Sequence, residues 1–156
     1  MSWILLPIAL AGNGLVAGGM MIAFLGGAPL LLRLPKEQYV PVHRFLVSRF
    51  DPFMPVCLIT ALIADLALVA TAPEAPVRAL AGTAAALLVA AIAVSLTKNV
   101  PINRWVAALD PDDLPPDWES VDPRRRWRDW NAVRTGLAAA ALLVNSLALS
   151  AALAAL

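Results

Sequence analysis

Long apolar runs constrain this chain more than any other feature of its sequence. A helix that crosses a bilayer needs about 20 largely apolar residues. Hydrophobic residues make up 60% of the 156 residues, well above the roughly 45–50% of soluble domains. The sequence therefore predicts an all-α, single-domain integral membrane protein, with residues 1–156 forming one four-transmembrane-helix bundle. The expected spans are Trp3–Leu32, Pro55–Thr71, Val77–Thr97 and Val133–Leu156.

The basic residues predict how the spans are oriented. They gather between the first and second spans and between the third and fourth, whereas the connection between the second and third has only Arg78. Because cytoplasmic loops are enriched in Lys and Arg, we expect both long loops in the cytoplasm and both termini outside. This gives an up-down-up-down path, and we expect a bacterial inner membrane. With no basic residue before its apolar run, the first span is expected to be a membrane helix and not a cleaved signal peptide.

Several local features refine this bundle. Asp122 as N-cap and Pro123 at the first helical position predict that helix four begins outside the membrane and runs without interruption to the C-terminus. The first span is long enough to tilt, or to have an unwound end near GGAPL. Gly14 and Gly18 form a small-xxx-small pair that favours close packing within the bundle, with a homo-oligomer seam as the alternative.

Polar residues at membrane depth are the first candidates for function. Asp65 lies in the middle of LITALIADLALVA, where a carboxylate costs about 2.5–3.5 kcal/mol to insert. It should therefore face the interior and have a partner, or be protonated. Asn13 and Asn145 lie at comparable depth, and we expect the three to form a buried cluster. This cluster is either a clamp between helices or an acid–base group.

A second set of candidates lies at the predicted cytoplasmic ends of spans three and four. The segment KNVPIN ends the third span, and we expect the chain to turn at Pro101 so that Asn99 and Asn103 project into a cavity. In helix four, residues at spacings of three, four and seven form a stripe on one face. The stripe consists of Trp127, Trp130, Asn131, Arg134, Ala138 and Asn145. An aromatic belt with a snorkelling cation explains the Trp and Arg residues but not Asn131. Together the two segments predict a small-molecule site, in which Lys98 also takes part.

His43 is the one histidine of the chain. Its predicted place is the first cytoplasmic loop, where a histidine is usually a solvated surface residue. It is also the side chain whose ordinary pKa suits base chemistry near neutral pH. A single histidine without a Cys or Glu cluster is a poor metal site, so we predict no metal site, although a metal or haem held by other ligands is left open.

The motifs NVPIN and WRDWNAVRTGLAAAALL, separated by an acidic linker, resemble the anthrone oxygenase family of small four-helix membrane proteins. GGAPLLLRLP after the first span and DPFMP before the second also resemble the family layout. In the segment that corresponds to DPFMP the family tends to have Asn-Pro-x-Phe, whereas this chain has Asp51-Pro52-Phe53.

The resemblance implies oxidation of aromatic polyketides in natural-product biosynthesis. Characterised relatives convert an anthrone methylene into a quinone carbonyl with O2 as co-substrate and without metal or flavin. On this basis Asn103, Asn131 and Arg134 are expected to donate hydrogen bonds to the enolate oxygen. Trp127 and Trp130 would stack on the aromatic substrate, and either His43 or Asp65 would be the base.

Two other functions compete with a membrane oxygenase. The Trp/Arg/Asn face could instead contact lipid headgroups or a partner protein in a non-catalytic module. A transporter is less favoured, because four spans are few and no inverted repeat is visible. A net charge of +1 with interleaved acids gives no case for a nucleic-acid partner, which leaves a hydrophobic aromatic substrate and the bilayer as the expected partners.

Overall fold

The computed structural model describes residues 2–155, and in this part of the chain it contains helices and no strand. Four stretches are long and apolar enough to cross a membrane. They comprise α1 (Ser2–Ile22), η1 (Ala23–Gly27) and α2 (Ala28–Arg33); α3 (Lys36–Phe50) and α4 (Phe53–Thr71); α5 (Ala75–Val94), η2 (Ser95–Asn99) and α6 (Val100–Ala108); and α7 (Trp118–Val121) and α8 (Arg124–Leu153). The predicted all-α membrane protein is confirmed.

The stretches are longer than a bilayer requires. At 1.5 Å per residue the 30 residues of α8 extend about 45 Å, whereas the hydrocarbon core is about 30 Å thick. Part of the bundle therefore lies beyond the hydrocarbon. The predicted continuous fourth helix is confirmed, but it starts one residue later than expected: Pro123 is the N-cap, and α8 begins at Arg124 and runs without a break. The Asp122 carboxylate accepts the backbone N–H of Arg124 at 3.0 Å.

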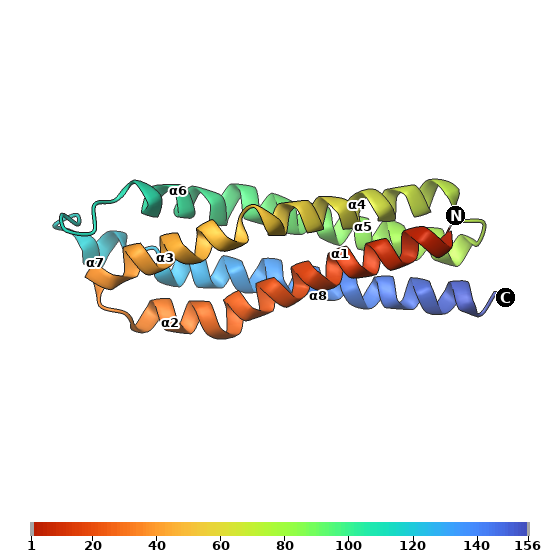
Figure 1. Ribbon diagram of the computed structural model, residues 1–156, viewed down its shortest axis with the longest axis horizontal. Helices are drawn as coiled ribbons and strands as arrows, with labels where there is room; N and C mark the ends of the chain where they lie inside the picture. The colour runs from red at the N-terminus through yellow and green to blue at the C-terminus, as the bar shows by residue number, and fades with distance from the viewer. Residues whose placement is uncertain (1, 156) are drawn as a thin grey trace.

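Both chain termini lie at one end of the elongated bundle, together with the α4–α5 connection (Figure 1). We call this the terminal end. The connections between α2 and α3 and between α6 and α7 lie at the opposite end (Figure 1), which we call the loop end. Most of the charged residues that follow the first and third spans are therefore gathered at the loop end.

Small residues bring the helices together in the terminal half. A buried cluster there combines Leu6 and Leu68 with six alanines from four helices and with Val77. A Cβ added at Gly12 would lie 2.9 Å from the Cys57 carbonyl oxygen of α4, so α1 and α4 touch backbone to backbone at this point. The prediction that Gly14 and Gly18 form the site of close helix packing is wrong. At Gly18 an added Cβ would meet nothing within 4 Å, and at Gly14 its nearest neighbour would be a leucine methyl at 4.0 Å.

The predicted turn at Pro101 is also wrong, and of the two alternatives for the first span the unwound end is not present. The GGAPL segment does not unwind, and the chain does not turn at Pro101; in both places a π-helical turn continues into a further α-helix. Pro29 and Pro101 each stand second in the α-helix that follows the π-helical turn. A proline lacks the N–H that an α-helical ladder needs, and the wider π turn shifts the hydrogen-bond register so that the helix continues past it.

Candidate functional site

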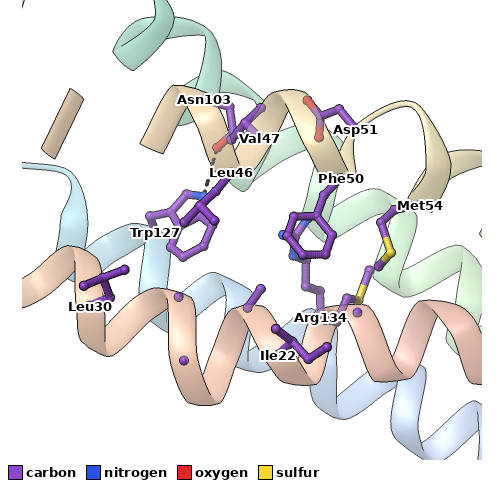
Figure 2. A pocket seen from close by; sticks show the side chains of 15 residues that line it. Ile22, Leu30, Leu46, Val47, Phe50, Asp51, Met54, Asn103, Trp127 and Arg134 are labelled. Carbon is purple, nitrogen blue, oxygen red and sulfur yellow. Dashed lines mark hydrogen bonds between the residues drawn. The ribbon is translucent and has the colours of Figure 1, made fainter. Parts of the chain in front are cut away.

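A cavity of about 290 Å³ lies toward the loop end of the bundle. Side chains of α3 and α4 form one wall, the α1–η1–α2 stretch forms the other, and α8 lies between them (Figure 2). Most of the lining is apolar. The lining residues are Gly19, Met20, Ile22, Ala23, Gly26, Gly27, Leu30, Leu46, Val47, Phe50, Asp51, Met54, Asn103, Trp127 and Arg134.

The cavity exists because the first two stretches pack closely in the terminal half, where they form α1 and α4, but separate toward the loop end, where they form α2 and α3. α1 packs extensively against α4, whereas α2 touches α3 at only a few positions. The wall formed by η1 also has little side-chain volume, because Gly26 and Gly27 lie on it. A Cβ at Gly26 would meet nothing within 4 Å. The π-helical turn and its glycines therefore leave space that side chains fill elsewhere in the bundle.

Arg134 is the one basic residue that lines the cavity. Its Nε donates to Asn131 Oδ1 at 3.0 Å and its Nη1 donates to Ser95 Oγ at 3.5 Å. Among the described residues no carboxylate lies within 4.0 Å of its guanidinium. The predicted stripe residue is thus held by hydrogen bonds to neutral groups. Its positive charge lies on the cavity that the Asp51 carboxylate also lines, and the two charges attract one another without a direct ion pair.

Asn103 is held in one orientation by two donors. Its Oδ1 accepts from Trp127 Nε1 at 2.9 Å and from His43 Nε2 at 3.1 Å. An indole N–H only donates, so a reversed amide would lose that bond. Asn103 lines the cavity, and within the described chain its Nδ2 has no hydrogen-bond partner. The amide therefore offers its N–H groups as a second donor on the cavity lining, in addition to Arg134.

His43 differs most from its predicted setting. The loop expected around it is helix α3, and only 1% of its surface is exposed. It lies between the rings of Tyr39 and Trp127, each with a centroid 5.3 Å away. Because Nε2 donates to Asn103, Nδ1 carries the lone pair, and Nδ1 is buried without a partner. His43 stands behind Asn103 and does not itself line the cavity.

Burial lowers the pKa of His43, and the hydrogen bond to Asn103 acts in the opposite direction. His43 lies in α3, whose charged residues Lys36, Glu37, Arg44 and Arg49 set it apart from the apolar α4 that follows in the same stretch. Its desolvation therefore comes from packed protein. The imidazole is therefore neutral at neutral pH. A neutral ring holds Asn103 through one N–H.

Asn99 and Asn131 form the layer behind the cavity. Asn99 Nδ2 donates to the backbone carbonyl of Trp127 at 3.2 Å, and Asn131 accepts from Arg134. Both side chains are fully buried, and neither lines the cavity. They hold α8 and Arg134 in place, which differs from the substrate contacts expected of them.

Lys98 and Trp130 are not brought to this cavity. Lys98 Nζ lies 5.0 Å from the centroid of the Trp130 ring, and both residues line a different hollow of the surface. The reason is helical phase: at 3.6 residues per turn, Trp130 points about 60° away from Trp127, whereas Arg134 points about 20° away.

The predicted polar cluster at membrane depth is only partly present. Asn145 Nδ2 donates to Asp65 Oδ2 at 3.3 Å. Asn13 instead binds the backbone of α8: oriented to satisfy both groups, it donates to the Ala138 carbonyl at 3.1 Å and accepts from the Leu142 N–H at 2.8 Å. Asp65 is fully buried and does not line the cavity. The Asp65–Asn145 pair therefore joins α4 to α8 away from the candidate site.

Asp51 is the cavity residue that sequence reasoning missed as a functional candidate. It lies between α3 and α4, is exposed, and lines the cavity at its rim. The signal was present in DPFMP, where an acid directly precedes the second apolar run. Phe50 and Leu46 were also missed, because a helix was not expected before that run.

A model of the anthrone oxygenase family matches residues 45–144, which is well over half of the chain. The chain belongs to the anthrone oxygenase family. No curated protein and no solved structure matches it. The matched region includes Asp51, Asn103, Trp127 and Arg134, whereas the glycine-rich wall and His43 lie before it. Among residues 2–155 no group of three or more His, Cys, Asp or Glu is placed to hold a metal ion.

Proposed function

We propose that this member of the family is a membrane-bound oxygenase that acts on a lipophilic aromatic substrate of the anthrone type. The reaction converts a ring methylene into a carbonyl: CH2 and O2 give C=O and H2O. The observation that carries the proposal is an apolar cavity with two hydrogen-bond donors, Arg134 and Asn103, on its lining. Its volume is close to the lower end of ligand pockets, about 300–1,000 Å³.

The two donors suit the charge that the reaction creates. Loss of a proton from the methylene places negative charge on the carbonyl oxygen across the ring system. Donors fixed in advance in a water-poor site stabilise such an oxyanion strongly. Arg134 supplies a positive charge and Asn103 an amide N–H, and both are oriented by neighbours and not by the substrate.

Asp51 is the best-placed base. It is the one carboxylate on the cavity lining, and no imidazole lines the cavity. Burial raises the pKa of Asp51, and the positive charge of Arg134 acts in the opposite direction. An Asp whose pKa is modestly raised can deprotonate a carbon acid when donors stabilise the enolate, as in ketosteroid isomerase. In this assignment His43 is a positioning residue that orients Asn103, and Asp65 has no part in the chemistry.

The remaining steps need O2 as co-substrate. The electron-rich enolate carbon forms a bond to one oxygen of O2, and protonation of the other oxygen gives a hydroperoxide. Loss of the second methylene proton then breaks the O–O bond, leaving one oxygen in the carbonyl and releasing the other in water. The aromatic rings of Trp127 and Phe50 on the lining provide flat apolar contacts for the substrate.

The proposal is tested with purified protein in lipid nanodiscs, an anthrone and O2, by following quinone formation against a protein-free control. We expect a clear acceleration that survives treatment with a metal chelator. Gly26→Trp should block it, because the new side chain stands at the cavity wall. Gly18→Trp is the matched control: Gly18 lies on the same stretch and also has free space around its Cα, but it does not line the cavity. Equal rates with and without wild-type protein would rule out this activity for that substrate.

A further inference from the structure

A second hollow of about 410 Å³ lies on the outer side of η2, α6 and α8. It shares no lining residue with the cavity described above. Two tryptophans and two basic residues line it, and they come from both sides of the groove. The lining residues are Thr97, Lys98, Pro101, Ile102, Trp105, Arg126 and Trp130.

The two cations of this groove have no acidic partner. Within the described chain neither Lys98 nor Arg126 has a carboxylate within 4.0 Å, whereas two nearby acids are already paired. Asp122 binds Arg124 at 2.6 Å, and Asp129 binds Arg128 at 2.7 Å. The positive charges of Lys98 and Arg126 can therefore bind an anion from outside the chain.

Trp130 helps to hold one of the two charges in place. Lys98 Nζ lies 5.0 Å from the Trp130 ring centroid, within the range of a cation–π contact. Trp105 forms the opposite part of the lining together with Ile102. The groove thus offers two cations beside flat apolar walls.

The depth of the groove indicates the source of the anion. Thr97 is the last residue of the third predicted span, and Trp130 stands three positions before the fourth span begins. The groove therefore lies at the boundary of the hydrocarbon, where tryptophans are enriched and where lipid phosphates are found. Basic pockets between transmembrane helices are known to bind anionic headgroups.

We propose that this groove binds the phosphate of an anionic phospholipid, with Lys98 and Arg126 contacting the phosphate and the tryptophans contacting the glycerol and upper acyl region. An ordinary aromatic belt predicts no preference for lipid charge and no dependence on these two cations. The site is independent of the oxygenase chemistry, because it lies on other residues.

The test compares lipid binding to the wild type and two matched double variants, by native mass spectrometry and by thermal unfolding in nanodiscs. Lys98→Gln with Arg126→Gln removes both groove cations. Arg104→Gln with Arg125→Gln removes two exposed cations from the same helices, α6 and α8, neither of which lines the groove. Phosphatidylcholine nanodiscs are compared with nanodiscs that also contain phosphatidylglycerol, and a third arm adds inorganic phosphate to phosphatidylcholine alone.

We expect phosphatidylglycerol to bind the wild type and the control variant equally and to raise their unfolding temperature. Binding to the groove variant should be roughly 10- to 30-fold weaker, and its thermal shift should disappear. Equal losses in the two double variants would overturn the proposal in favour of general surface charge. A response to inorganic phosphate without a response to phosphatidylglycerol would also overturn it, because the ligand would then be a soluble phosphate.

Discussion

The two halves of the bundle are built from the same four stretches but pack in opposite ways. In the terminal half alanines and Gly12 bring helix backbones into contact. In the loop half α2 and α3 separate, and aromatic rings, a π-helical turn and a polar layer surround a cavity (Figures 1 and 2). The terminal half is a scaffold whose tight packing fixes the helices, so the loop half can keep an open site.

This difference predicts that changes in the cavity alter turnover, whereas changes in the terminal half alter stability. The sharpest case is Asp51→Asn, which keeps the shape of the side chain and removes the proposed base. Loss of a general base typically costs about 10²- to 10⁴-fold in rate, and we expect this loss in quinone formation with an unchanged unfolding temperature. Asp112→Asn, in an exposed loop, is the control. Wild-type turnover by Asp51→Asn would remove Asp51 from the mechanism.

Arg134→Gln should have the next largest effect. Removal of one oxyanion donor costs about 10²- to 10³-fold in kcat, and Arg134→Lys should recover part of it by restoring the charge. Steady-state kinetics would separate the two roles of the residue. A raised KM with unchanged kcat would mean that Arg134 binds substrate without stabilising the enolate.

Gly12→Val tests the scaffold half. Its side chain would begin 2.9 Å from the Cys57 carbonyl oxygen, and such overpacking typically costs about 1–3 kcal/mol in the free energy of unfolding. Gly18→Val, on the same helix in open space, should cost much less. Denaturant unfolding in detergent measures both. Equal stabilities would show that α1 and α4 are not held as closely as described.

The smallest expected effect comes from His43. Because its pKa is lowered in the folded protein, the unfolded chain binds the proton more readily, and acid favours unfolding. The stability that this ring contributes is complete above its ordinary pKa of about 6.5 and is lost as pH falls through the lower folded value, by at most about 1.4 kcal/mol per pH unit. His43→Gln should flatten this part of the pH–stability curve. An identical curve for both proteins would contradict the buried, neutral assignment.

The sequence was sufficient for the spans because apolar length alone defines them, and Pro123 marked the start of α8 to within one residue. It also placed Asn103 and Arg134 at the same end of the bundle, where both line one cavity, since both lie beside the basic segments that follow the first and third spans. It could not place Trp130 correctly, because the phase of α8 relative to its neighbours depends on packing. Nor could it show that α3 is a helix covered by α6 and Trp118, so His43 was expected at the surface and Asp51 was not considered as a base.

The central claim is that an aromatic substrate occupies the cavity with its oxygen toward Arg134. A structure of the protein with bound anthraquinone, the unreactive product, tests this most directly. We predict ring density between Phe50 and Gly26, with a carbonyl oxygen within hydrogen-bond distance of the Arg134 guanidinium. Density at the Lys98–Trp130 groove alone, or an empty cavity at saturating ligand, would contradict the account.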